Sequence, residues 1–231
     1  MILKNGIIHS ALLESAPVLH GFTTRERGNL GFGKNPGDPV VIENRKKLFE
    51  SLNVNQRVHV QPRQIHSDIT IDAGDFVPGC EADAGYSSHS QHLLSVLTAD
   101  CVPILVYHSG GTVAAIHAGW RGIHSEIIPK TLALLKPGPV AVIGPAIGPC
   151  CYEVGEDLAA DFEKQFGSEV LDLTRAKPHL DLIRAATIQL LNAGVSEVEA
   201  SHLCTSCHPD LFFSFRRDGS SGRQMSFIGL L

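Results

Sequence analysis

In the stretch Ser95–Ile123, SVLTADCVPILVYHSGGTVAAIHAGWRGI, and the two residues before it, two apolar segments each lead to a side chain able to bind a transition metal. The first segment, Leu93–Thr98, leads into Cys101, and the second, Thr112–Ile116, leads into His117. Short apolar runs that are bounded by turn residues and rich in β-branched residues are typical of buried strands. We therefore expect two buried strands whose ends present a thiol and an imidazole.

A third candidate ligand, His66, lies upstream in the segment QPRQIHSD and follows the strand-like residues 57–61. Two imidazoles and one thiolate form a set of three protein ligands, which leaves one position of a tetrahedral metal open. An open position distinguishes a catalytic zinc from a structural one. The pattern predicts that His66, Cys101 and His117 bind one metal ion. The spacings match no short zinc motif, so a hydrogen-bonded structural role for each histidine stays the alternative.

Zinc is the metal that this ligand set favours. One thiolate and two imidazoles suit its intermediate softness, and zinc needs no redox partner. Copper also accepts two histidines and a cysteine. Multicopper oxidases, however, build their clusters from closely paired histidines, and the sequence contains no His-x-His pair. Copper is therefore the less favoured metal.

Two further pairs of cysteines occur near the C-terminal half of the chain. Cys204 and Cys207 have a spacing seen in metal sites, but a single CxxC pair makes at most half of a structural zinc site. Cys150 and Cys151 are adjacent, and adjacent cysteines rarely bind one metal together. We expect both pairs to be thiols packed in loops.

The composition indicates a globular protein with a full core. The chain has 231 residues, of which 43% are hydrophobic and 19% charged, with a formal net charge of −5. Because no segment is rich in lysine or arginine, nucleic acid is not expected as the main partner. The longest uncharged stretch, Pro137–Tyr152, is broken by glycine and proline and does not predict a membrane span. The N-terminal residues lack the pattern of a signal peptide, so we expect a cytoplasmic protein whose cysteines are thiols or ligands.

Strands and helices alternate without the regular rhythm of a βαβ fold. Strands are also predicted over Pro17–Thr24, Arg57–Gln61, Glu81–Tyr86, Val140–Ile143 and Met225–Leu231, and the segment Phe212–Phe215 is expected to be short and extended. Helices are predicted over Pro39–Leu52, capped by Asp38, and over Arg121–Leu135, Glu156–Phe166 and Pro178–Asn192, with Gly194 ending the last. This order predicts an α+β fold in which residues 1–231 form a single domain with mixed sheets layered against helices.

Several segments together closely resemble the YfiH family, whose members are also called laccase-domain or multicopper polyphenol oxidase proteins. The matching segments are GFTTR (21–25), ENR (43–45), QIHS (64–67), LTADCVPILV (97–106), AAIHAGWRG (114–122), GPAIGPCCYEVG (144–155) and CTSCHPDLFFSFRRDGSSGRQ (204–224). They extend from near residue 20 to the C-terminus, and the TADC and HAGWRG motifs are highly specific in combination. The loop RERGNLGFG (25–33) departs from the family, in which this loop is usually longer and contains a Gly-Gly pair.

The resemblance implies a mixed α/β fold with layered sheets and a zinc ion held by His66, Cys101 and His117. It also implies an enzyme of purine nucleosides, which catalyses phosphorolysis of adenosine, inosine, guanosine and methylthioadenosine and deamination of adenosine. The copper implied by the oxidase name conflicts with the absence of paired histidines.

These reactions assign candidate roles to charged and aromatic residues. Deamination needs a carboxylate that moves protons, for which Asp100 is the first candidate and Asp83 the second. Asp100 has an alternative role, in which it orients a metal ligand or caps a turn. Trp120 is expected to stack on a base or to cap the core. Phosphate binding calls for guanidinium groups. The candidates are Arg25, Arg45 and Arg121, followed by Arg216 and Arg223, and for each a surface or ion-pair role is the alternative.

Three other functions are compatible with the same residues. A metal-free cysteine hydrolase or amidase would use Cys101 as nucleophile and His117 as base, because a thiolate needs a neighbouring imidazole. A copper-dependent polyphenol oxidase follows from the family's other name. A metal-binding or interaction module without enzymatic activity is the third alternative.

Overall fold

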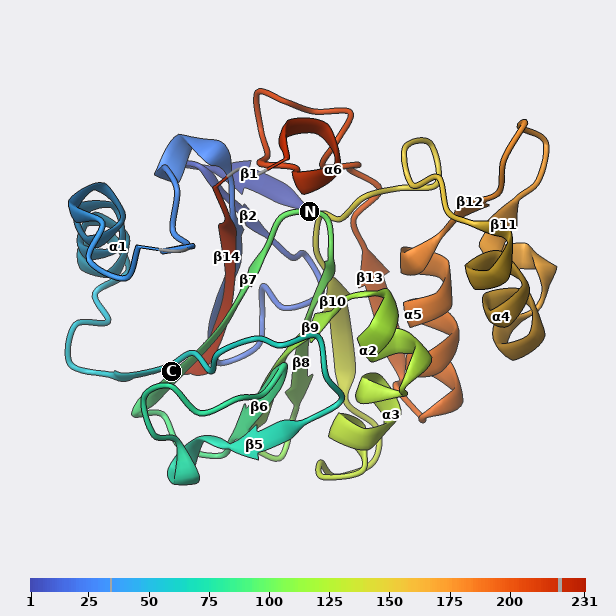
Figure 1. Ribbon diagram of the computed structural model, residues 1–231. Coiled ribbons are helices and arrows are strands. Elements are labelled where there is room, and N and C mark those ends of the chain that lie inside the picture. Colours follow the sequence, from blue (N-terminus) through green and yellow to red (C-terminus); the bar gives the residue numbers. More distant parts are fainter. Residues whose placement is uncertain (34, 220–221) are drawn as a thin grey trace.

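Two six-stranded sheets pack face to face, and helices cover the outer face of each sheet (Figure 1). The computed structural model describes residues 1–33, 35–219 and 222–231. The first sheet has the order β1-β2-β3-β14-β7-β4. Its strands are β1 (Ile2–Lys4), β2 (Ile7–His9), β3 (Val18–Thr23), β14 (Gln224–Leu230), β7 (His92–Thr98) and β4 (Val58–Val60).

The second sheet has the order β13-β10-β8-β9-β6-β5. Its strands are β13 (Glu197–Ala200), β10 (Val140–Ile143), β8 (Val102–His108), β9 (Thr112–Ala118), β6 (Ala84–Ser87) and β5 (Thr70–Asp72). A two-stranded sheet pairs β11 (Leu171–Asp172) with β12 (His179–Leu180). Parallel pairs occur at β4·β7, β5·β6 and β10·β13, and the other pairs are antiparallel, so both large sheets are mixed.

The helices form the outer layers. On the first sheet lies α1 (Pro39–Leu52), and on the second lie α2 (Trp120–His124), α3 (Ile127–Leu132), α4 (Glu156–Phe166) and α5 (Leu182–Asn192) (Figure 1). A short helix α6 (Phe215–Asp218) precedes β14, and single 3-10 turns occupy Arg25–Arg27 (η1), Ala73–Asp75 (η2) and Ser168–Val170 (η3). The predicted α+β class, a single domain with mixed sheets layered against helices, is confirmed.

The apolar runs of the central strands arise because both faces of these strands are buried. In β7, Leu94 and Val96 point into the core between the two sheets, whereas Leu93 and Leu97 pack in the cluster under α1. The same alternation occurs in β8 and β9, whose outer faces pack against the helices. A strand that is apolar on both faces has a continuous hydrophobic sequence rather than an alternating one.

Several predicted elements agree with the structure. Helix α1 begins at Pro39, and the carboxylate of Asp38 accepts a hydrogen bond from the amide of Val40 at 2.9 Å. Helix α4 has the predicted bounds. Gly194, with φ +85°, follows α5, and its amide donates to the carbonyl of Leu191, as expected for a glycine that ends a helix.

The predicted helix Arg121–Leu135 is wrong as a single element. The chain forms α2 and α3 instead, and Glu126 between them adopts a left-handed conformation with φ +63°. Pro129 causes the break, because proline has no amide hydrogen and its ring clashes with the carbonyl four residues earlier. The proline is accommodated in the first turn of α3, where that amide has no partner within the helix.

Other predicted elements also differ from the structure. The predicted helix Pro178–Asn192 begins only at Leu182, after the short strand β12 and a cap in which Asp181 accepts from the amide of Arg184. The segment Phe212–Phe215, expected to be extended, is extended at Ser214 (φ −139°, ψ 124°), but Phe215 begins α6. The predicted elements do not include β8, which forms a hairpin with β9.

The connection between β7 and β8 crosses from one sheet to the other. Residues Ala99–Cys101 make this crossing, and Asp100 adopts φ +95° within it. Because β8 and β9 are antiparallel, Val102 at the start of β8 pairs with Ala118 at the end of β9. The register therefore places Cys101 and His117 at the same end of the second sheet.

Among the described residues, no helix combines the length and apolar character that crossing a bilayer requires.

Candidate metal centre

His66, Cys101 and His117 converge at this end of the sheet. Their candidate ligand atoms all lie within 4.8 Å of one another. The Sγ atom of Cys101 is 3.9 Å from Nε2 of His66, and the two imidazole rings meet edge to face with centroids 4.9 Å apart. Around a tetrahedral zinc ion, a sulfur and a nitrogen ligand lie about 3.6 Å apart. The structure thus brings together the three predicted ligands at a spacing close to that of a metal site.

Asp83, which is fully buried just before β6, orients His117. Its Oδ1 accepts a hydrogen bond from Nδ1 of His117 at 2.7 Å. The proton of the neutral imidazole is therefore on Nδ1, and Nε2 is the nitrogen whose lone pair is available. A carboxylate that binds the far nitrogen of a histidine is the usual support of a metal ligand.

The same carboxylate also anchors the loop that carries His66. Oδ1 accepts from the amide of His66 at 3.0 Å, and Oδ2 accepts from the amide and hydroxyl of Ser67 at 2.6 and 2.7 Å. His66 has φ +59°, a conformation that a non-glycine residue adopts at an energetic cost and that its surroundings must maintain. Burial acts to raise the pKa of Asp83, but the bonds from His117 and Ser67 lower it to about 2. Asp83 is thus an ionised hydrogen-bond acceptor.

The thiol and the imidazole perturb each other when no metal is bound. Burial acts to raise the pKa of Cys101, but His117 and then His66 lower it to about 6. Burial acts to lower the pKa of His117, but Cys101 and Asp83 raise it to about 9. The metal-free pair is therefore a thiolate and an imidazolium near neutral pH. Since a metal binds neutral imidazole, loading the site releases the proton of His117.

Gly119 leaves the space that this cluster needs. A Cβ atom on Gly119 would lie 3.1 Å from Cδ2 of His66 and 3.2 Å from Sγ of Cys101. The three donors and this space fit one zinc ion. They do not fit a multicopper cluster, because in the described part of the chain the other cluster of candidate ligands contains only cysteines.

Asp100, the predicted proton carrier, binds the C-terminal loop. Its Oδ1 accepts from the hydroxyl of Thr205 at 2.6 Å, and its Oδ2 accepts from the backbone amide of Arg216 at 2.7 Å. Its carbonyl accepts from the amide of Ile147 at 2.9 Å. The residue beside Cys101 thus holds two loops that are distant in sequence against the cluster.

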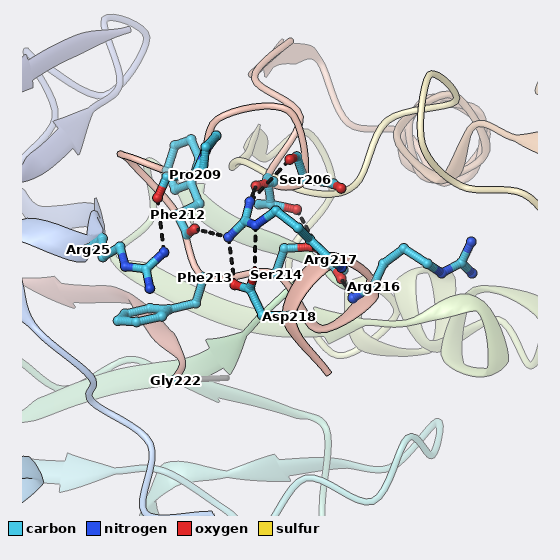
Figure 2. A network of polar contacts seen from close by, with 12 residues as sticks. Arg25, Ser206, Pro209, Phe212, Phe213, Ser214, Arg216, Arg217, Asp218 and Gly222 are labelled. Atoms are coloured by element: carbon cyan, nitrogen blue, oxygen red, sulfur yellow. Dashed lines mark hydrogen bonds and ion pairs between the residues drawn. The ribbon is translucent and has the colours of Figure 1, made fainter. Parts of the chain in front are cut away.

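The C-terminal loop is further held by Arg217 (Figure 2). Its guanidinium donates to the carbonyls of Thr205, Ser206 and Phe212 and forms a two-point ion pair with Asp218. Arg25 lies beside this network, donates to the carbonyl of Pro209 at 3.0 Å and stacks on Phe213. Figure 2 shows the side chain of Arg216 leading away from the network.

Two exposed arginines and a tyrosine surround the side of the cluster near Cys101. The guanidinium carbon of Arg216 lies 4.9 Å from the ring centroid of Tyr152, and that of Arg121 lies 4.3 Å from the ring of Trp120. Burial and then Cys101 raise the pKa of Tyr152 to about 12, with Arg216 and Arg121 acting in the opposite direction. Tyr152 was not among the predicted site residues, although it lies in the GPAIGPCCYEVG motif.

Arg45 lies elsewhere. It belongs to α1, its Nε donates to the carbonyl of Leu30 at 2.7 Å, and its guanidinium stacks on Phe32. Figure 1 shows α1 and the α2 end of the site on opposite sides of the two sheets. The structure therefore does not bring Arg45 together with His66, Cys101 and His117.

Two bacterial purine nucleoside phosphorylases are similar in sequence to this chain over most of its length. The purine nucleoside phosphorylase YfiH of Escherichia coli (strain K12) is 36% identical over 212 residues, which cover 88% of this chain and 86% of that protein. The purine nucleoside phosphorylase YlmD of Geobacillus stearothermophilus is 37% identical, with 93% and 90% covered.

Solved structures share the fold. The crystal structure of YlmD from Geobacillus stearothermophilus has a TM-score of 0.88 and 32% identity and covers 100% of this chain and 98% of its own. That of the Neisseria meningitidis protein NMB0706 has a TM-score of 0.89 and 30% identity, with 97% and 99% covered. The model of the family described as multi-copper polyphenol oxidoreductase laccase matches residues 20–231. The chain belongs to this family and has the same fold as the two solved structures.

Proposed function

We propose that the chain is a zinc-dependent enzyme of purine nucleosides whose main reaction is phosphorolysis. The names of the Escherichia coli and Geobacillus relatives support the substrate class and the reaction. The observation that carries the proposal for this chain is the convergence of His66, Cys101 and His117 beside exposed arginines. Residues 1–231 then form one catalytic domain, and we expect the protein to act in the cytoplasm.

His66, Cys101 and His117 would hold the zinc ion through one sulfur and two nitrogens. A zinc ion bound there would supply Lewis-acid chemistry. Asp83 acts as a positioning residue, because it fixes the Nδ1 proton of His117 and the backbone of His66 at once. Both of its oxygens are occupied by these bonds and those of Ser67, which supports positioning rather than proton transfer.

Phosphorolysis needs phosphate next to the nucleoside. The phosphate oxygen attacks C1′ of the ribose, the bond from C1′ to the purine nitrogen breaks, and ribose 1-phosphate and the free purine result. Arg216 and Arg121 are the proposed phosphate ligands, because both are exposed and both act on Tyr152 at the Cys101 side of the cluster. Arg25 contacts Pro209 and Phe213 rather than Tyr152, and Arg45 lies on α1 on the other side of the two sheets, so neither is included.

The departing purine needs a proton or a hydrogen bond. Tyr152 keeps its proton at neutral pH because its pKa is raised to about 12, so its hydroxyl is a hydrogen-bond donor beside the cluster. Trp120 packs partly against the core and carries the guanidinium of Arg121 on its ring. Its proposed role is to orient Arg121, and the exposed part of its ring contacts the base.

Adenosine deamination is a second proposed reaction of the same site. Deamination adds water to C6 of adenine and releases ammonia, and a zinc ion held by the three ligands would activate that water. Its proton carrier would have to be one of the carboxylates, and Asp100 is the nearer in sequence to Cys101. The bonds from Thr205 and Arg216 to Asp100 favour the alternative that Asp100 positions the C-terminal loop.

A cysteine hydrolase is the main rival. Cys101, His117 and Asp83 have the order of a nucleophile, a base and an orienting carboxylate. His66 favours a metal site over a cysteine hydrolase. Its imidazole lies 3.9 Å from the sulfur, has no role in such a triad and is a natural metal ligand.

The test measures zinc content and activity together. Zinc-loaded protein is incubated with inosine and phosphate, and hypoxanthine and ribose 1-phosphate are quantified. We expect product from the wild type, and loss of both product and one zinc ion in Cys101→Ala. Cys80→Ala, a matched change outside both cysteine-containing clusters, should retain both. Absence of product at zinc saturation would refute the proposed reaction. Full activity in zinc-free protein, lost on alkylation of Cys101, would establish the hydrolase instead.

A further inference from the structure

Four cysteines form a second cluster outside the proposed active site. The sulfur atoms of Cys150, Cys151, Cys204 and Cys207 all lie within 4.8 Å of one another. The sulfur of Cys207 is 3.4 Å from that of Cys150 and 3.3 Å from that of Cys151. All four cysteines are free and lie outside the named helices and strands, as expected, but the two pairs meet in one cluster. Cys150 and Cys151 are the second pair that the CxxC segment lacked.

The sheet topology explains why these distant segments meet. Strands β10 and β13 are parallel neighbours, and Ile143 at the end of β10 pairs with Ala200 at the end of β13. The two following loops therefore leave the sheet at the same edge. They remain joined, because Ala146 and Cys204 form a β-bridge and the amide of Gly148 donates to Sγ of Cys204 at 3.3 Å.

The geometry favours a cation over disulfides. The observed sulfur separations exceed the S–S bond length of about 2.05 Å, and all four cysteines are free. Cys207 is almost equally distant from two sulfurs, whereas a disulfide joins only one pair. Four thiolates around one zinc ion, with Zn–S bonds of about 2.3 Å, lie about 3.8 Å apart. The cluster is close to this arrangement, and small shifts of the side chains suffice to complete it.

We propose that Cys150, Cys151, Cys204 and Cys207 are a second metal site that binds one Zn²⁺ ion through four thiolates. Four sulfur ligands in a tetrahedron suit zinc and leave no position open for substrate, which is the character of a structural site. This distinguishes it from the cluster of His66, Cys101 and His117.

A metal at this position links the two loops that flank the proposed active site. One loop carries Tyr152, directly after Cys151, and the other leads to Arg216. Arg216 also donates to the carbonyls of Cys151 and Glu153, at 3.4 and 2.9 Å. The four-cysteine site therefore holds Tyr152 and Arg216 in their mutual positions. Only this consequence rests on the proposed function, because the binding of zinc does not depend on the reaction.

The first experiment counts zinc in the purified full-length protein by elemental analysis. We expect two equivalents in the wild type and in the control Cys80→Ser, and one equivalent in Cys207→Ser. Cys101→Ala should also contain one, bound at the four cysteines. Two equivalents in Cys207→Ser would overturn the proposal, as would iron in place of zinc at this site. Two equivalents in Cys101→Ala would instead refute the ligand role of Cys101 and leave the four-cysteine site intact.

A second measurement serves if Cys207→Ser fails to fold. Metal-stripped Cys101→Ala is titrated with Co²⁺ alone, and the absorption of cobalt–thiolate charge transfer is recorded. We expect a saturating signal at one equivalent of Co²⁺, displaced by Zn²⁺. No such signal in protein whose four thiols react as free thiols would overturn the proposal. An intact mass that is lower by two hydrogens would do so too, because it would reveal a disulfide.

Discussion

Replacing Asp83 with asparagine keeps the size of the side chain but removes its charge and turns one acceptor into a donor. In the native protein the two carboxylate oxygens accept hydrogen bonds from the amides of Ile65, His66 and Ser67, the hydroxyl of Ser67 and the ring of His117. An asparagine can direct its oxygen to only one of these two groups of donors. One group must therefore face an NH₂, whichever way the amide turns.

Both orientations are unfavourable, for different reasons. If the oxygen faces His117, the amides of Ile65 and Ser67 lose their acceptor. Each unsatisfied amide lowers the free energy of unfolding by about 1–3 kcal/mol, and the two together lower it by about 2–6 kcal/mol. If the NH₂ faces His117, the imidazole must accept at Nδ1 and carry its proton on Nε2. That proton blocks the nitrogen that would bind zinc. Loss of such a supporting carboxylate typically weakens metal binding about 10–100-fold, or about 1.4–2.7 kcal/mol.

We therefore expect metal-free Asp83→Asn to unfold at a lower urea concentration than the metal-free wild type, and to bind zinc at least about tenfold more weakly. Zinc affinity is measured by competition with a chromogenic chelator. The same measurement on Cys101→Ala gives the zinc that binds outside the cluster of His66, Cys101 and His117. Asp161→Asn, on the exposed face of α4, is the matched control and should match the wild type. An Asp83→Asn protein with unchanged urea midpoint and zinc affinity would refute the reasoning.

Four further predictions concern the cluster and its surroundings. In metal-stripped protein, the ultraviolet thiolate absorption that Cys101→Ala lacks should appear as the pH rises through about 6; titration near 9 would contradict the pairing with His117. Because folding moves the thiol proton of Cys101 to His117 with almost no net uptake or release, the urea midpoint should change little between about pH 6.5 and 9, and a steep change in this range would contradict the pairing. Gly119→Ala should fold but bind zinc more weakly, because its methyl group pushes against the sulfur at 3.2 Å, and an unchanged chelator titration would count against that crowding. Arg216→Gln should raise the KM for phosphate about 10–100-fold with little change in the KM for nucleoside, whereas Arg25→Gln should not, and equal effects in both variants would remove Arg216 as a phosphate ligand.

Local sequence rules predicted the elements whose signals lie within a few residues. The cap at Asp38 and proline at the first position of α1 were sufficient to locate that helix, since capping is a local interaction. The apolar runs of β7 and β9 were sufficient to locate strands that are buried on both faces. The helix over residues 121–135 was wrong because the position of Pro129 within a turn depends on where the helix restarts, and the packing of α3 decides that.

The resemblance and the residue chemistry named His66, Cys101 and His117, and the proximity of Cys101 and His117 was predictable because they lie at the ends of neighbouring strands. The roles of Asp83 and Asp100 were not, because the partners of these carboxylates come from loops distant in the chain. A carboxylate appears the same in a sequence whether it carries protons or anchors a backbone.

The sequence by itself determined the class of the fold, the family, and the three side chains proposed as metal ligands. Only the tertiary structure decided that Cys150 and Cys151 lie against Cys204 and Cys207, that Tyr152 borders the cluster, and that Arg45 lies on the far side of both sheets. The physical reason is that hydrogen bonding and periodicity act over a few residues, whereas β10 and β13 become neighbours through sheet pairing across more than fifty residues.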